Sequence, residues 1–258
     1  MIDSHCHLNF NAFKGDFLEV AQRAKDSGLK KIIIPGSDNE NSKLAINISN
    51  NINDNLGNSF AFAAIGIHPV HVRKKYDFAK IEKLAAFAAA IGECGLDFFH
   101  DKEKKTSSEQ IYLLQKHFDL AVKSGLPLIF HNRDADEETL SFIDRQKEVP
   151  KIVFHCFSSN WKFAEQILEK GFSISFTGNI TYGNKSLKKV VERASLNKIM
   201  IETDSPYIVP EPLRSEGVKR NEPAYVCEIA KKIAEIKDIP LNEVVTATTQ
   251  NAIDFFQI

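Results

Sequence analysis

Short apolar runs alternate with amphipathic stretches along the whole chain. The runs are apolar at nearly every position, which is typical of parallel strands in a sheet covered by helices. The amphipathic stretches have helical spacing, and the first begins with Asp16 and ends with Gly28, both signals of a helix boundary. We expect strands at 1–7, 30–36, 59–67, 88–92, 127–130, 151–154, 172–176 and 198–201, and helices at 16–28, 42–52, 78–87, 108–124, 137–147, 162–170 and 186–194.

Eight strand-like runs alternating with helices over 258 residues predict the α/β class, and within it a single (β/α)8 TIM barrel rather than an open sheet. No linker rich in Pro, Gly or Ser divides the chain, so we expect one domain over residues 1–258. Residues 221–258 predict two or three further helices, which we place on the outside of the barrel.

The charge balance and the cysteines limit the class of protein. The formal net charge is -1, so a nucleic-acid partner would need a local basic patch. The cysteines are far apart, without a Cys-x-x-Cys pair, which favours reduced thiols in a cytoplasmic protein over a disulfide framework or a zinc knuckle. The chain has neither a secretory signal nor an apolar run of about 20 residues, so we expect no export and no membrane association.

Histidines and carboxylates follow the predicted strands at the points where the strands end. The carboxyl ends of the strands of a barrel converge on one mouth, so residues from distant parts of the chain would meet there. Imidazole and carboxylate ligands suit divalent zinc, manganese, iron or magnesium, and this set matches a binuclear site. The residues are His5, His7, Glu93, His131, His155 and Asp204.

No single one of these residues carries the prediction. A His-x-His pair such as His5 and His7 can arise by chance, and one histidine after an apolar run is more often a core or surface residue. Glu93 or Asp204 alone would also suit a helix N-cap in a loop. Their shared position at strand ends is what favours a metal site.

The other histidines suggest different roles. His68 follows the third predicted strand at the mouth, and we assign it to contact with the substrate or the leaving group. His117 lies in a predicted helix as an ordinary packing or surface residue, and His71 and His100 lie in loops. Neighbours on a strand point to opposite faces, so we expect the cysteines that follow predicted ligands to face the helix layer: Cys6, Cys94 and Cys156.

Six segments stand in a recognisable order: MIDSHCHL at 1–8, GIHP at 66–69, IGECGLDF at 91–98, HNR at 131–133, HCFS at 155–158 and ETDSPY at 202–207. They resemble the successive motifs of the TatD family of metal-dependent deoxyribonucleases, within the amidohydrolase-like barrels. The likeness continues in FTGNIT at 176–181 and RNEPAY at 220–225, so it spans essentially the whole chain. Segment 210–219 is longer than the family's usual connection, which leaves the substrate preference open.

The resemblance implies a hydrolase with two divalent ions, which we expect to be Mg²⁺, Mn²⁺ or Zn²⁺. Family members are described as 3′ to 5′ exonucleases on DNA, and some as deacylases of D-aminoacyl-tRNA. We therefore expect a monomer that acts on single-stranded DNA or 3′ ends, with aminoacyl-tRNA as an alternative substrate. The ligands that the resemblance implies are His5, His7, Glu93 and Asp204 for the first ion, and a bridging Glu93 with His131 and His155 for the second.

Phosphodiester hydrolysis at such a site needs no covalent protein intermediate, and no Ser or Cys lies in a nucleophile motif. Two divalent ions lower the pKa of a water between them toward about 7. Asp204 is our candidate acid-base residue, since a carboxylate beside that water can accept its proton. Glu93 and His68 complete the predicted catalytic set.

Basic and aromatic residues in loops at the mouth are candidates for substrate binding. Arg214 and Lys219 would add to a local basic patch, or else are solvated surface charges. Phe98 would stack on a base or pack at the rim. The substrate contacts that we predict are His68, Arg133, Tyr207 and Arg220.

Three rival functions would use the same residues. A small-molecule amidohydrolase or lactonase would cleave amides or esters without a basic rim. A D-aminoacyl-tRNA deacylase would need contacts to RNA. A non-catalytic metal-binding protein would hold ions without turnover, and the combination of an apparent base with an open mouth argues against it.

Overall fold

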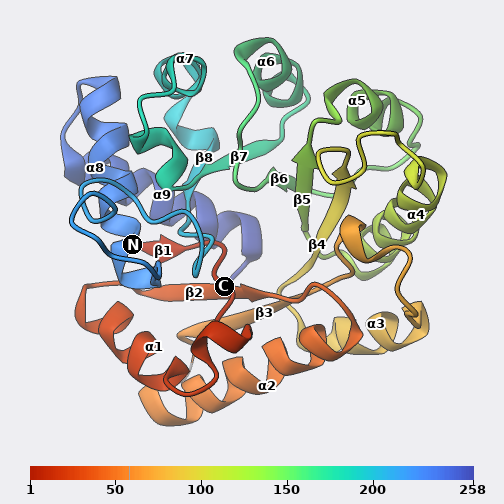
Figure 1. The fold of residues 1–258 in the computed structure, drawn as a ribbon, viewed down its shortest axis with the longest axis horizontal. Coiled ribbons are helices and arrows are strands. Elements are labelled where there is room, and N and C mark those ends of the chain that lie inside the picture. The colour runs from red at the N-terminus through yellow and green to blue at the C-terminus, as the bar shows by residue number, and fades with distance from the viewer. Residues whose placement is uncertain (58) are drawn as a thin grey trace.

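The computed structural model describes residues 1–57 and 59–258, and in it a ring of strands is surrounded by helices (Figure 1). The described strands form one parallel sheet in which each strand pairs with the next in chain order. They are β1 (Ile2–Asp3), β2 (Lys31–Pro35), β3 (Ala61–Ile65), β4 (Ala90–Asp97), β5 (Leu128–Arg133), β6 (Ile152–Phe154), β7 (Ser173–Phe176) and β8 (Ile199–Ile201). The α-helices are α1 (Phe17–Asp26), α2 (Asn39–Leu56), α3 (Phe78–Leu84), α4 (Ser107–Ser124), α5 (Asp136–Asp144), α6 (Trp161–Glu169), α7 (Lys185–Arg193), α8 (Val226–Lys237) and α9 (Leu241–Phe256).

The sheet closes between its last strand and its first. The Ser4 amide donates a hydrogen bond to the Ile201 carbonyl at 3.1 Å. Beyond the strand ends, the Asp204 amide donates to the His5 carbonyl at 2.9 Å. These bonds join β8 to β1, so the (β/α)8 TIM barrel that the sequence predicts is confirmed.

Side chains alternate along the strands between two apolar cores. Ile32 and Ile34 of β2 belong to the outer core, which the helices cover, whereas Ile33 between them belongs to an inner cluster. The apolar faces of the helices complete the outer core, as Ala45 and Ile52 of α2 do. The inner cluster draws one residue from each of seven strands: Ile2, Ile33, Ala64, Ala90, Ile129, Val153 and Met200.

Several helices begin at polar residues that cap them. At the start of α2, the Asp38 side chain accepts a hydrogen bond from the Asn41 amide, and at the start of α6 the Asn160 side chain accepts one from the Phe163 amide. Across the two described ranges, no helix combines the length and the apolar character that crossing a membrane requires.

The last two helices cover different parts of the barrel. α8 packs against α7 and β8 and completes the outer ring of helices (Figure 1). α9 instead adds Phe255 and Phe256 to the inner cluster, and its Asn251 side chain donates to the Ile199 carbonyl at the start of β8 at 2.7 Å. α9 therefore covers the amino-terminal end of the barrel. The expected placement on the outside holds for α8 and is wrong for α9, because the open end of the ring needs apolar residues to fill it.

β4 is longer than the predicted strand at 88–92. It runs to Asp97, and its register with β5 shifts between Ile91 and Cys94. Glu93 therefore lies inside the strand rather than at its end. Gly95 has a φ of +151°, and a Cβ atom there would lie 1.9 Å from the His131 carbonyl oxygen, so only glycine allows β4 and β5 to approach this closely.

Replacing Phe256 with alanine tests the role of α9. The Phe256 side chain is only 3% exposed, so its loss should leave a cavity and lower the free energy of unfolding by about 3 kcal/mol. Urea titration followed by circular dichroism measures this change. Phe87→Ala is the matched control, because Phe87 is 70% exposed and its loss should change the free energy by less than about 0.5 kcal/mol. Equal effects of the two substitutions would contradict the placement of α9.

Candidate metal centre

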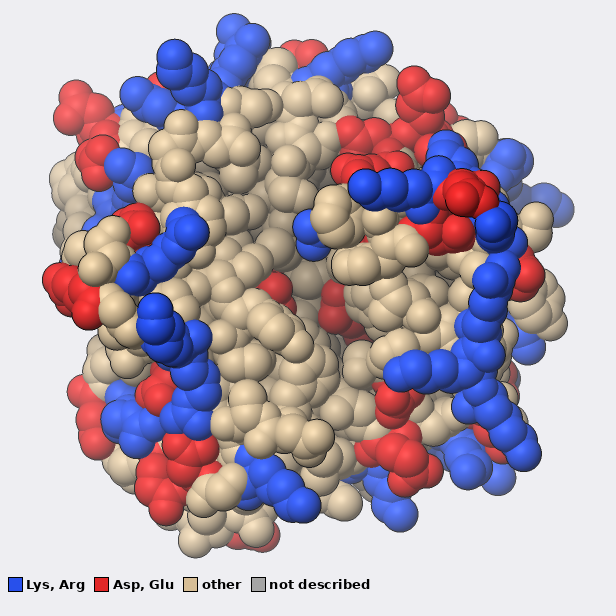
Figure 2. Space-filling model, viewed as in Figure 1, with Lys and Arg blue, Asp and Glu red and all other residues tan. Residues whose placement is uncertain are grey.

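The predicted ligands lie together at the carboxyl ends of the strands. They border a cavity of about 640 Å³, a size that suits a small molecule or a nucleotide. Figure 2 shows acidic side chains in a hollow near the centre of this face, with Lys and Arg side chains toward its edges. His5 is fully buried beside the cavity, and the other five line it: His7, Glu93, His131, His155 and Asp204.

Four of these residues converge on one small space. The Nε2 atoms of His5 and His7 are 3.2 Å apart. Oε2 of Glu93 lies 3.6 Å from the first of these nitrogens and 3.7 Å from the second. Oδ1 of Asp204 lies 3.8 Å and 3.4 Å from the same two atoms. Two imidazole nitrogens and two carboxylate oxygens therefore surround a space that suits a divalent ion.

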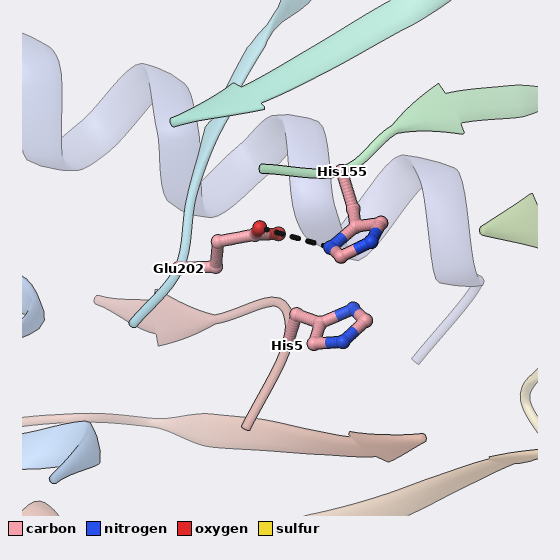
Figure 3. A group of neighbouring side chains, drawn as sticks. All are labelled: His5, His155 and Glu202. Carbon is pink, nitrogen blue, oxygen red and sulfur yellow. Dashed lines mark ion pairs between the residues drawn. The ribbon is translucent and has the colours of Figure 1, made fainter. Parts of the chain in front are cut away.

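A second group converges on the other oxygen of Glu93. Its Oε1 atom lies 2.8 Å from Nδ1 of His131 and 2.8 Å from Nε2 of His155, and these nitrogens are 3.3 Å apart. The rings of His5 and His155 stack with their centroids 4.1 Å apart, so the two groups touch (Figure 3). One carboxylate thus faces two groups of histidines, as a residue that bridges two ions would.

Burial and charge set the protonation states in this cluster. Burial alone would raise the pKa of Glu93, but His155 and His68 outweigh it and hold the pKa well below its usual range. Burial lowers the pKa of His5 to about 4, so this ring is neutral at pH 7. An ionised carboxylate and a neutral imidazole are the forms that bind divalent metals.

Glu202 is a buried carboxylate behind His155 and is not among the predicted site residues. Its Oε1 atom accepts from the Cys156 amide at 2.6 Å and lies 3.4 Å from Nδ1 of His155 (Figure 3). Its Oε2 atom accepts from the Ser175 hydroxyl at 2.5 Å. Such a carboxylate orients the imidazole so that its other nitrogen faces the ligand cluster. The feature of the sequence that could have indicated Glu202 is its position as a second acid directly after β8, two residues before Asp204.

Asp97 orients His131 in the way that Glu202 orients His155. Its Oδ2 atom lies 3.0 Å from Nε2 of His131 and 2.9 Å from Nδ1 of His100. Burial would lower the pKa of His131, but Asp97 and Glu93 outweigh it and raise the pKa. A divalent ion would supply the positive charge that these carboxylates favour. Asp97 is not among the predicted site residues, because the predicted strand stops at residue 92 whereas β4 runs to Asp97.

The donor set fits a divalent metal. The groups His5, His7, Glu93 and Glu93, His131, His155 each bring three ligand atoms within 4.8 Å of one another. Imidazole nitrogens and carboxylate oxygens together suit zinc, manganese, iron or magnesium. The cluster therefore has the chemistry to hold metal.

Comparison with known proteins agrees with this chemistry. The family model described as TatD related DNase matches residues 2–257. The chain belongs to the TatD family. A Bacillus subtilis (strain 168) protein named as an uncharacterized metal-dependent hydrolase, YabD, is 34% identical over 264 residues, which cover 100% of this chain and 99% of the relative. Escherichia coli (strain K12) YcfH, which has the same description, is 30% identical over 273 residues, with 100% and 96% covered.

Solved structures of TatD proteins share the fold. The crystal structure of YJJV, a TatD homologue from Escherichia coli, matches with a TM-score of 0.90 at 28% identity and covers 100% of this chain and 98% of that one. A hydrolase of the TatD family from Entamoeba histolytica matches with a TM-score of 0.84 at 27% identity, covering 99% and 97%. This TatD protein is therefore a metal-dependent hydrolase built on a TIM barrel.

His68 touches the ligand cluster of the TatD protein. Its Nε2 atom lies 3.2 Å from Oε1 of Glu93, and its Nδ1 atom accepts from the Val70 amide at 3.2 Å. β3 and β4 are neighbours and Glu93 lies inside β4, which brings His68 against the predicted ligands. Contact with the substrate stays a prediction for this residue.

The predicted substrate contacts do not all line the cavity. Arg133 and Tyr207 line the cavity. Arg220 does not, because its guanidinium donates to both carboxylate oxygens of Asp16, at 3.0 Å and 2.6 Å, and to Glu222 at 2.8 Å. This arginine joins α1 to the segment after β8, so its expected role in substrate binding is not supported. The loop position was visible in the sequence, but the two enclosing carboxylates were not.

Other predicted residues also pack rather than face the cavity. The Arg214 guanidinium stacks on the Tyr182 ring, 4.5 Å from its centroid, and Phe98 is buried.

Cys6 and Cys94 lie in the outer core, as expected. Cys156 lines the cavity instead of facing the helix layer, because β6 has already ended and the backbone turns at this residue with a φ of +46°.

His117 of α4 is fully buried, and both of its ring nitrogens have partners. Nδ1 donates to the Leu113 carbonyl at 2.8 Å, and Nε2 accepts from the Ile67 amide at 3.0 Å. Because an amide can only donate, the ring must be neutral, and burial lowers the pKa of His117 to about 4. His117 thereby fixes the chain that leads to His68.

The buried His117 should make stability fall in mild acid. Its pKa is about 4 in the folded protein, against about 6.5 in an unfolded chain, so the unfolded chain takes up the proton first. The contribution is fully present above about pH 6.5 and is lost as the pH falls toward 4, by up to about 3 kcal/mol. Urea titrations between pH 7 and pH 5, with a chelator present, measure the free energy of unfolding. It should fall less steeply with decreasing pH in His117→Asn than in the wild-type protein. Parallel profiles for the two proteins would contradict the neutral buried ring.

Proposed function

We propose that the protein is a 3′ to 5′ exodeoxyribonuclease that cleaves phosphodiester bonds with two divalent ions. The observation that carries the proposal is the division of the Glu93 carboxylate between two groups of histidines. When bound, the ions would lower the pKa of an attacking water and stabilise charge on the phosphoryl oxygens. The proposed ligands are His5, His7, Glu93, His131, His155 and Asp204.

The cavity edge supports a nucleic-acid substrate. Arg133 lines it and can donate paired hydrogen bonds to a phosphate. Tyr207 also lines it and is 55% exposed, so its ring is available to stack on a base. The description of the family as TatD related DNase points to the same class of substrate.

Asp204 and His68 have the positions for proton transfer and orientation. Asp204 faces His7 with Oδ1 and also borders the cavity, so it can accept a proton from a water there. His68 lies beside Oε1 of Glu93 and borders the same cavity, where it can contact a phosphoryl or leaving oxygen.

The proposed bridging role of Glu93 can be tested by metal content. The wild-type protein, dialysed against Mn²⁺ and then against buffer, should keep two ions per chain by inductively coupled plasma mass spectrometry. Glu93→Gln preserves the shape but removes the charge that both groups share, so we expect at most one ion. Glu148→Gln, at an exposed carboxylate, is the control and should keep two. Two ions in the Glu93 variant would refute the bridge.

The proposed activity can be tested on single-stranded DNA with a 5′ label. The metal-loaded protein should shorten it one nucleotide at a time from the 3′ end, and EDTA should stop the reaction. Asp204→Asn should lower kcat by about 10²-fold to 10⁴-fold if this carboxylate moves the proton. D-aminoacyl-tRNA and a p-nitrophenyl ester serve as parallel substrates. Release of D-amino acid or p-nitrophenol without any shortening of DNA would replace the nuclease with one of the rival hydrolases.

A further inference from the structure

Three side chains outside the proposed ligand set gather at one edge of the cavity. Arg133 and His100 both line it. The guanidinium carbon of Arg133 lies 4.1 Å from the centroid of the Phe99 ring, and the His100 ring meets Phe99 edge-on with the centroids 5.0 Å apart. A single aromatic ring thus supports two nitrogen-rich side chains that border the cavity.

Arg133 is free to bind a ligand. Within residues 1–57 and 59–258, no carboxylate forms an ion pair with its guanidinium, whereas Arg220 is enclosed by Asp16 and Glu222. Stacking on Phe99 covers one flat face of the guanidinium and leaves its N–H groups at the edge. This is the arrangement in which arginine binds a phosphate with two hydrogen bonds.

Asp97 holds His100 in place. Its carboxylate accepts from the His100 amide at 2.9 Å and lies 2.9 Å from Nδ1 of the same residue. The carboxylate therefore accepts the hydrogen on Nδ1 of His100 and fixes the orientation of the ring. Nε2 of His100 remains free to bind a ligand at the cavity edge.

One carboxylate lies between this edge and the proposed metal centre. Asp97 lies between His100 and His131, at 2.9 Å from Nδ1 of the first and 3.0 Å from Nε2 of the second. His131 in turn contacts Glu93 with its other nitrogen, at 2.8 Å. An anion held by His100 and Arg133 is therefore a different group from the one that reacts at Glu93.

We propose that Arg133 and His100, supported by Phe99 and Asp97, form a subsite for a second phosphate of the substrate, distinct from the phosphodiester that is cleaved. The inference rests on the proposed function and narrows it. A preferred substrate carries at least two phosphates, as an oligonucleotide does, and a small neutral amide or ester lacks the group that this subsite binds.

Three dinucleotides that share one phosphodiester bond test the subsite: dithymidine monophosphate, and the same compound with a phosphate on its 5′ or on its 3′ hydroxyl. The metal-loaded wild-type protein should show a KM about tenfold lower for one of the phosphorylated compounds, because charged hydrogen bonds to the added group are gained. Arg133→Met and His100→Gln should each reduce this preference to about twofold or less. Phe99→Leu should raise KM for the phosphorylated compound without changing kcat.

Arg145→Met is the matched control, since Arg145 is an exposed arginine after α5 that does not line the cavity, and the full preference should remain. Equal KM values for the three compounds in the wild-type protein would overturn the subsite. So would a preference that survives in both Arg133→Met and His100→Gln, or a loss of activity that is equal for phosphorylated and unphosphorylated compounds.

Equilibrium dialysis of the same compounds against the metal-free protein separates the two proposals. If none is hydrolysed but the phosphorylated compound binds more tightly through Arg133 and His100, the nuclease proposal fails and the subsite stands. If the unphosphorylated compound is hydrolysed and no difference in binding or KM is found, the nuclease stands and the subsite fails.

Discussion

The buried carboxylate of Glu93 is the group around which the mouth of the barrel is arranged. One of its oxygens meets His131 and His155, and the other faces His5 and His7. A buried charge without partners costs several kcal/mol, so the carboxylate and the rings around it depend on one another. The local structure of β4 makes this arrangement possible, because the strand carries Glu93 in its interior.

A second set of carboxylates decides which nitrogen each imidazole presents. His131 turns Nδ1 toward Glu93 while Asp97 faces its Nε2, and His155 turns Nε2 inward while Glu202 faces its Nδ1. The two rings therefore use opposite nitrogens on the same oxygen. The difference follows from where the outer acids lie, since Asp97 ends β4 and Glu202 follows β8. Asp97 also contacts His100 at the cavity edge, so the same residue touches both the ligand cluster and that edge.

The sequence was enough to predict the barrel and the residues that meet at its mouth. Apolar runs reveal buried parallel strands, and strand ends in a barrel converge, which is why residues as far apart as His5 and Asp204 could be placed together. What failed depended on neighbours that spacing does not show. The sequence does not show that Asp16 pairs with Arg220, or that β6 ends before Cys156 and so turns this side chain toward the cavity. Asp97 is absent from the predicted site because the predicted strand stops at residue 92. Glu202 is absent because a second acid after β8 does not by itself show which imidazole it orients.

The two halves of the polypeptide share the proposed ligands, and closure of the barrel between β8 and β1 brings them together. His5, His7 and Glu93 precede the loop between α4 and β5, whereas His131, His155 and Asp204 follow it. Each proposed ion would take ligands from both halves. A chain cut in that loop would leave two half-barrels, neither with a full set of donors for either ion. Metal binding at this mouth therefore requires both half-barrels to associate, and measuring bound metal would show whether they reassemble.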